Sequence, residues 1–160
     1  MSSMFNKEKN ASLETQRFLE FNLGDESYAI GLLKVKEVIT PPEITPIPKA
    51  PAYVCGLINL RGTVLTVIDL RKKLGIQPTQ DVSQNAVIIF DLEERFVGVV
   101  VDSIQKVLNI SEGGIKPVPD SDGQSMSHLL GILHHDDKLT MWLDPKMLLD
   151  GTATVLKAAA

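Results

Sequence analysis

The chain has 160 residues, 44% of them hydrophobic, and its 16 basic and 20 acidic residues give a net charge of -4. This near balance excludes the strongly basic surface that nucleic-acid binding or an anionic membrane would require. The single cysteine, Cys55, excludes an intrachain disulfide framework, and without a signal peptide or an apolar run of ~18 residues we expect a soluble cytosolic protein that inserts into no membrane.

The two ends of the chain look different from its middle. Residues 1–15 are rich in Ser, Asn, Lys and Glu, and residues 151–160 form a short tail, so we expect both to be disordered. The fold begins at residues 18–23, which alternate apolar and polar side chains. Turn-forming residues 24–26 then lead into residues 27–31, which together predict a β hairpin.

The following segments favour strands over helices. They are short, rich in β-branched or aromatic residues and bounded by Gly, Asp, Asn or Lys. These predicted strands are residues 64–68, 86–90, 96–101 and 139–143. Only residues 70–74 and 145–149 look helical, and each is too short to be stable without tertiary contacts. The pattern predicts an all-β fold with short accessory helices.

An internal repeat organises the chain. Residues 55–74 align with residues 130–149 at a constant offset of 75. Upstream, residues 35–39 align with 104–108 at an offset of 69, and residues 44–48 with 115–119 at 71. We therefore expect two β lobes, residues 16–80 and 81–150. Lobes of this size have marginal cores, so they should pack on each other. We expect the functional surface at the seam between them.

Two matched aspartates are the best candidates for catalysis, because Asp69 and Asp144 occupy equivalent positions in the repeat. A hydrolase with paired carboxylates is one interpretation of this pattern. However, each Asp closes an apolar strand and opens a short helix, and a Pro follows Asp144 at the first helical position. This favours two helix N-caps over an active site.

Three further residues could be mistaken for a chemical site. His134 and His135 are adjacent, and neighbouring side chains on a strand point to opposite faces, so we expect an exposed hairpin tip in place of a metal site. We expect Cys55 to be a small buried apolar residue. The sequence thus predicts no catalytic residue, no metal site and no cofactor.

A charge pair changes sign across the repeat. Glu37 and Arg61 stand within apolar stretches of the first half, and their counterparts are Lys106 and Asp136. Two interpretations remain open. The pair is either a structural salt bridge kept with reversed polarity, or a set of charges exposed at the seam between the lobes that recognise a partner.

Five segments resemble the CheW family of bacterial chemotaxis coupling proteins. They are residues 33–37, 51–62, 67–71, 97–102 and 107–108, within a match from Arg17 to Leu149, and the Asn-Leu-Arg-Gly block at 59–62 is the most specific. The resemblance implies two packed five-stranded SH3-like barrels. It also implies a cytoplasmic adaptor without enzymatic activity, which links the regulatory domain of the histidine kinase CheA to the cytoplasmic hairpin of chemoreceptors in membrane-bound arrays.

The resemblance also implies two sets of contact residues. Those expected to bind the receptor are Val35, Glu37, Gly56, Arg61, Gly62, Gly98, Ile104 and Val107. Ile44 and Ile47, on a predicted edge strand with flanking prolines, are the candidates for binding the kinase. Cys55 stands where many relatives carry lysine. The alternative function is a sensor module that binds a small molecule in the groove between the lobes.

Overall fold

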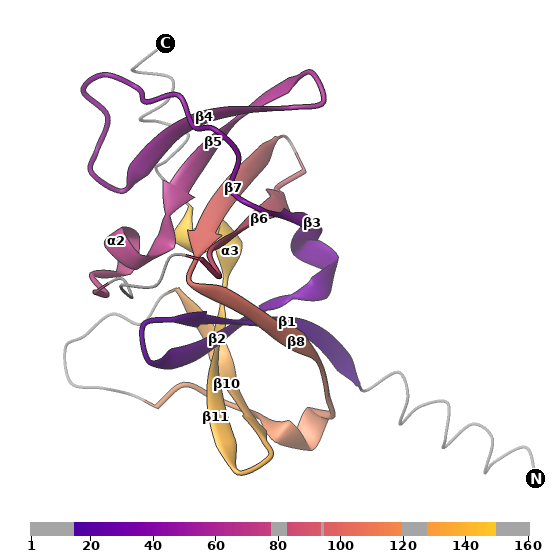
Figure 1. The fold of residues 1–160 in the computed structure, drawn as a ribbon. Coiled ribbons are helices and arrows are strands. Elements are labelled where there is room, and N and C mark those ends of the chain that lie inside the picture. Colours follow the sequence, from indigo (N-terminus) through magenta and orange to yellow (C-terminus); the bar gives the residue numbers. More distant parts are fainter. Residues whose placement is uncertain (1–14, 78–82, 94, 120–127, 150–160) are drawn as a thin grey trace, which may run out of the picture.

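The computed structural model describes residues 15–77, 83–93, 95–119 and 128–149, which form two β sheets and two short α helices. The sheets are stacked one above the other in Figure 1. Residues 1–14 and 151–160, which we expect to be disordered, lie outside the described residues. None of the described residues forms a helix that is long and apolar enough to cross a membrane.

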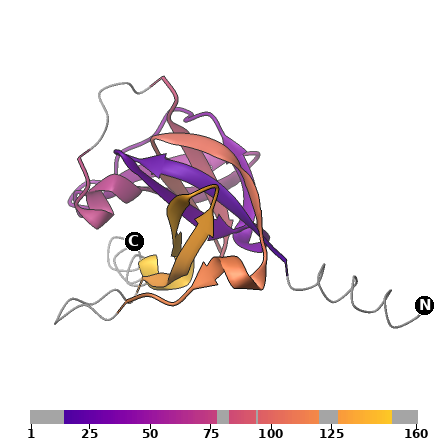
Figure 2. The same ribbon diagram turned by 90° about the horizontal axis from the view of Figure 1, so that it is seen from below.

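Each sheet curls into a small SH3-like barrel, as predicted, although one of them has six strands in place of the expected five. Barrel A, the lower one in Figure 1, is built in the order β8 (Ser103–Ile110), β1 (Gln16–Leu23), β2 (Glu26–Gly31), β11 (Lys138–Leu143), β10 (Leu129–His135) and β9 (Ile115–Lys116). Barrel B, the upper one, has the order β3 (Val35–Ile39), β6 (Ala86–Asp91), β7 (Phe96–Val101), β5 (Thr63–Asp69) and β4 (Val54–Leu60). Figure 2, seen from below, shows curved β8 beside β1 and the hairpin of β10 and β11 next to them.

The barrels do not follow the predicted lobes. The hairpin of β1 and β2 comes from the first half of the chain but belongs to barrel A, whose other strands come from the second half. In the same way, β6 and β7 complete barrel B. The boundary expected between residues 80 and 81 therefore does not separate one barrel from the other, because each barrel contains strands from both sides of it. The reason is that β2 pairs in parallel with β11, and β7 with β5, so each half lends its first hairpin to the other.

The strand registers reproduce the repeat. Tyr28 pairs with Met141 in barrel A, and Val97 pairs with Thr66 in barrel B. These two pairs are related by the offsets of 69 and 75 predicted from the sequence. The short β9 also has a counterpart in barrel B, where a single bridge joins Thr45 to Leu57 in place of the predicted strand over residues 43–47.

Three apolar clusters hold the fold together. The largest is shared by both barrels, since it contains Phe21 and Ile30 of β1 and β2 together with Ile88 and Phe90 of β6. Two smaller clusters each lie within one barrel, one around Val67 of barrel B and one in barrel A. Because the largest cluster is built from both exchanged hairpins, neither barrel has its complete core without the other.

Two short helices follow β5 and β11, as predicted. Helix α2 (Leu70–Leu74) begins at Asp69, whose carboxylate accepts hydrogen bonds from the backbone N–H groups of Arg71 and Lys72, and it ends at Gly75 in a left-handed conformation. Helix α3 (Pro145–Leu148) is capped by Asp144, which accepts from the N–H of residue 146 at 3.0 Å. The capping interpretation of both aspartates is confirmed.

A buried ionic network joins the two barrels. The guanidinium of Arg71 donates to both carboxylate oxygens of Asp69, from Nε at 2.9 Å and from Nη2 at 3.0 Å. Its Nη1 donates to Oδ1 of Asp102 at 2.7 Å, and Oδ2 of Asp102 accepts from the backbone N–H of Gly24 at 2.5 Å. All three charged residues are no more than 7% exposed. The network therefore runs from α2 in barrel B to the β1–β2 turn in barrel A.

The network also shifts the pKa of its members. Burial alone would raise the pKa of Asp69, but hydrogen bonds and charge from Arg71, with two backbone N–H groups, outweigh burial and hold it below its usual value. Hydrogen bonding to Asp69 first, and then to Asp102, raises the pKa of Arg71 despite its burial. Asp69 and Arg71 are therefore both charged at neutral pH.

We predict that Asp69→Asn lowers the free energy of unfolding by about 3 kcal/mol at pH 7, because it leaves Arg71 without its bidentate partner. The pKa of Asp69 lies below its unfolded value of about 3.9, so the stabilisation is complete above that pH and is lost as pH falls through the folded value. Urea unfolding at pH 7, 5 and 3 should show the difference shrinking at acid pH.

The matched control is Asp144→Asn, which keeps a capping oxygen on a helix outside any buried network and should cost less than about 1 kcal/mol. Equal losses for the two variants would contradict the role given to Arg71.

Candidate functional site

Strands β3 and β8 are repeat-related edge strands that border one hollow. Each pairs with a neighbour on one side only among the described strands, β3 with β6 and β8 with β1. Val35 and Ile104, at equivalent positions, pack partly buried against the shared core. Val38 and Val107, also equivalent, are each 40% exposed. Val38 and Ile104 line a hollow of about 330 Å³, so the two strands present apolar side chains to a common surface.

Both predicted charge pairs form. Arg61 donates to Glu37 in barrel B, and Lys106 lies 3.7 Å from Asp136 in barrel A, so the reversed polarity is real. The Arg61 side chain is 66% exposed and that of Asp136 is 81% exposed. Pairs this exposed contribute little to stability. Stability alone therefore does not account for keeping the pair in both halves.

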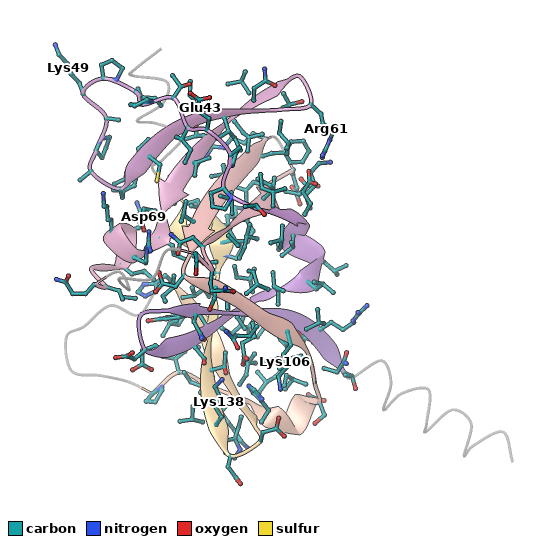
Figure 3. The ribbon with its side chains drawn as sticks, viewed as in Figure 1. Glu43, Lys49, Arg61, Asp69, Lys106 and Lys138 are labelled. Atoms are coloured by element: carbon teal, nitrogen blue, oxygen red, sulfur yellow. The ribbon has the colours of Figure 1, made fainter. Side chains whose placement is uncertain are left out.

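The hairpin turns explain where these charges stand. Arg61 and Gly62 both have positive φ, 51° and 87°, at the turn between β4 and β5. Asp136 and Asp137 have positive φ, 48° and 57°, at the turn between β10 and β11. Two successive left-handed residues match the right-handed twist of the flanking strands. Figure 3 shows Arg61 at the outer end of barrel B, so it lies away from the level where the barrels meet, although it was expected at the seam.

The predicted glycines divide into one exposed and two buried positions. Gly62 lies at the exposed turn, where its N–H donates to the Asn59 side chain at 2.9 Å. Gly56 has a φ of 145°, and a Cβ there would run into the Thr45 carbonyl. At Gly98 a Cβ would lie 3.0 Å from Val87. Gly56 and Gly98 therefore allow close packing inside barrel B, and neither is exposed for contact with a partner.

The predicted kinase contacts lie on the segment that bridges to β4. Thr45 exchanges two backbone hydrogen bonds of 2.8 Å with Leu57. Ile44 is partly buried and packs against the core of barrel B, and Ile47 is partly buried as well. The segment is an irregular cover over β4, because the prolines among residues 41–48 cannot donate to a longer ladder.

His135 corrects one expectation. His134 and the turn that follows are exposed as predicted, but the His135 side chain is only 11% exposed. Its Nε2 lies 3.2 Å from the carboxylate of Glu20 and 2.9 Å from the hydroxyl of Thr140, and Lys138 lies 3.6 Å from Glu20 on the other side. Glu20 is a buried carboxylate of β1, so this hairpin end carries a polar core.

The matching end of barrel B is apolar. The repeat places Ile89, Leu60 and Leu65 where barrel A has Glu20, His135 and Thr140, and these three residues belong to or pack against the barrel B core. They also line a hollow of about 200 Å³ together with Arg61 and Phe96. The two ends of the molecule have therefore diverged in the chemistry that they offer.

Cys55 is partly buried against the core of barrel B. Burial, and after it the charge of Asp69, raises the pKa of its thiol, so the thiol stays protonated at neutral pH. The expectation of an apolar role is consistent with this, although the side chain is half-buried. Among the described residues, no three His, Cys, Asp or Glu side chains gather in a way that could hold a metal ion.

One hollow was missed from the sequence. It has about 460 Å³ and lies beside the 3-10 helix η1 (Leu32–Lys34) that leads from β2 to β3. Leu33 is fully exposed at its edge, and Leu130 is 48% exposed. Arg17 and Lys34 also line it, but both are exposed. The only signal in the sequence was the apolar pair at residues 32–33 directly after a predicted strand.

The architecture and the surface define a class of protein: a duplicated two-barrel binding module with an apolar surface between repeat-related edge strands. The model of the CheW-like domain matches residues 17–153. The chain therefore belongs to the CheW-like domain family.

Individual relatives agree. The chain is 33% identical over 117 residues to a chemotaxis protein CheW of Rhizobium meliloti, covering 73% of this chain and 76% of the relative. It is 32% identical over 142 residues to the chemotaxis protein CheW of Klebsiella aerogenes, covering 88% and 86%. The crystal structure of the scaffolding protein TtCheW from Thermoanaerobacter tengcongensis matches with a TM-score of 0.78 and 31% identity, over 84% of this chain and 92% of that chain.

We predict that Gly56→Ala lowers the free energy of unfolding by about 2–4 kcal/mol, because the methyl group strikes the Thr45 bridge in a left-handed backbone region. Gly62→Ala meets open space and should cost about 1 kcal/mol, from backbone conformation alone. Urea unfolding of the two variants measures the difference. A loss at Gly56 no larger than at Gly62 would show that the bridge is not held as described.

Proposed function

We propose that the chain is a chemotaxis coupling adaptor, which joins the cytoplasmic hairpin of membrane-spanning chemoreceptors to the histidine kinase CheA. The observation that carries the proposal is the set of apolar side chains on β3 and β8, two equivalent edge strands, in a chain of the CheW-like domain family. A helical hairpin needs apolar anchors with a polar rim. The sensor alternative gains no support from the hollow at η1, because two of its three charged lining residues, Arg17 and Lys34, are exposed and the third, Asp144, caps a helix.

The receptor would use the strip formed by Val35, Ile104 and Val107. Val107 is the exposed member, while Val35 and Ile104 form the floor that joins this strip to the shared core. Glu37 and Arg61 form the polar rim in this proposal. The exposure of their ion pair leaves the Arg61 guanidinium able to meet a partner, since an isolated surface pair gains little by staying closed.

Gly56, Gly62 and Gly98 support the surface indirectly. Gly62 permits the turn that presents Arg61, and the other two let the barrel B strands pack without displacement. The regulatory domain of the kinase would contact the outer segment with Ile44 and Ile47. Both side chains are partly buried, but Ile44 already packs on the barrel B core, so Ile47 is the better candidate for a contact with the kinase.

In this proposal the chain has no catalytic role. It lies in the cytoplasm, held at the membrane-bound receptor array through its partners, and its two contacts place the receptor and the kinase in one assembly. The buried and capping positions of Asp69 and Asp144 support this, since neither carboxylate faces a hollow together with the other.

We predict that Arg61→Glu weakens binding of the receptor hairpin about tenfold or more, because it removes a rim charge and repels Glu37. Titration calorimetry with a soluble receptor hairpin measures the loss. The double variant Glu37→Arg with Arg61→Glu recreates the polarity seen in barrel A. This double variant should restore the ion pair. Receptor binding should nevertheless stay weak, because in this proposal the Arg61 side chain itself contacts the receptor.

The matched control exchanges the barrel A pair, Lys106→Asp with Asp136→Lys, and should leave receptor affinity within about twofold of the parent. Full recovery of binding in the barrel B double variant would show that the pair acts only as a brace.

A further inference from the structure

The chain crosses between the barrels at two repeat-related places. One crossing is Asp102, the residue between β7 of barrel B and β8 of barrel A. The other is η1, which leads from β2 of barrel A to β3 of barrel B. The offset of 69 puts Leu33 of η1 at the position that Asp102 holds in the second half. Ile104 follows Asp102 by two residues, as Val35 follows Leu33.

The crossing at Asp102 is held by three hydrogen bonds. Its carboxylate accepts from Arg71 and from Gly24, and its backbone N–H donates to the carbonyl of Asn22 at 3.1 Å. Gly24 is also close to the segment after α2, where a Cβ would lie 3.1 Å from Ile76. One residue is thereby tied to the helix of barrel B and to a strand and a turn of barrel A.

The crossing at η1 has no equivalent buried network, because its counterpart of Asp102 is apolar and its counterpart of Arg71 is exposed. Leu33 replaces Asp102 and is fully exposed. Lys146 replaces Arg71 and is exposed, and Asp144 replaces Asp69 and only caps its helix. Hollows of about 460 Å³ and 260 Å³ lie here, both lined by Lys34 and Pro145. Figure 1 shows α2 and α3 both at the level where the two sheets meet.

We propose that Arg71 and Asp102 are positioning residues, which pin one crossing so that the two barrels can change their angle only about that point. The pin fixes the start of β8, whereas β3 follows the unpinned crossing. The angle between the barrels therefore sets the separation of β3 and β8. Hinges of this kind need few residues at the pivot and free space on the opposite side.

The consequence for binding rests on the proposed function, because β3 and β8 carry the proposed receptor contacts. The pin itself does not rest on it. A change of barrel angle would widen or narrow the apolar surface between Val38 and Ile104 without altering any side chain on it.

The test is a distance measurement between the outer ends of the two barrels. Spin labels are placed at Val64→Cys and Leu139→Cys, repeat-related exposed positions on the β4–β5 and β10–β11 hairpins, in a Cys55→Ala background. Electron–electron resonance of the full chain should give one narrow distance distribution. Arg71→Met, and the milder Asp102→Asn, should broaden it about twofold or more while circular dichroism stays native.

The matched control is Lys146→Met at the unpinned crossing, which should leave the distribution unchanged. The proposal is overturned if the Arg71 and Asp102 variants keep the narrow distribution, or if Lys146→Met broadens it equally. Unfolding of both pin variants would also count against it, because the network would then be needed for each barrel's own fold. Receptor affinity, measured on the same proteins, separates the two ideas: a broadened distribution with unchanged affinity keeps the pin and contradicts the proposed binding surface.

Discussion

The parallel pairing of β2 with β11 and of β7 with β5 is the constraint on which the structure depends. It forces each half of the chain to give its first hairpin to the other half. The exchanged hairpins meet in the shared apolar cluster, which includes Phe21, Ile30 and Phe90. A barrel of this size buries enough apolar surface for only marginal stability on its own. The exchange solves this by making the interface between the barrels the largest core of the molecule.

A buried charge network beside such a core needs a reason other than stability. Replacing a buried ion pair by apolar side chains is often neutral or stabilising, so Arg71, Asp69 and Asp102 are costly unless their directed hydrogen bonds are needed. Apolar contacts do not fix an angle between two bodies, because they are not directional. The network adds directed hydrogen bonds at one crossing, whereas at the other Leu32 packs on the shared core and Leu33 is exposed beside a hollow.

The sequence predicted local chemistry better than long-range pairing. The helix caps at Asp69 and Asp144 followed from residue types and spacing, and the repeat gave the registers that the strands adopt. The hairpin exchange could not be predicted, because both lobe assignments bury the same apolar faces and differ only in which strands pair. Glu20 was missed for a similar reason. Its neighbours alternate as an ordinary strand, and its partners His135 and Thr140 are more than 100 residues away.

Of the candidate site, the sequence predicted the residue types and the reversed charge pair but not their placement. Val107 is exposed and Val35 is partly buried. The local sequence does not predict this difference in exposure, because both residues stand at apolar positions of similar edge strands. Arg61 was expected at the seam since its segment is apolar, yet the length of the hairpin carries it to the outer end.

Duplication by itself would produce two equal ends, and two equal ends would compete for the same partner. The repeat places Ile89 and Leu65 of barrel B where barrel A has Glu20 and Thr140. The hairpin end of barrel B therefore has a hollow lined by apolar side chains beside Arg61, and that of barrel A has a buried polar cluster. The exposed ion pairs beside them are opposite in polarity. A surface that fits an apolar side chain next to a cation is a poor fit for the same segment at the other end, where the charges are reversed. The divergence of the repeats thus leaves one symmetric scaffold with two chemically different ends, so a segment that fits one end is disfavoured at the other.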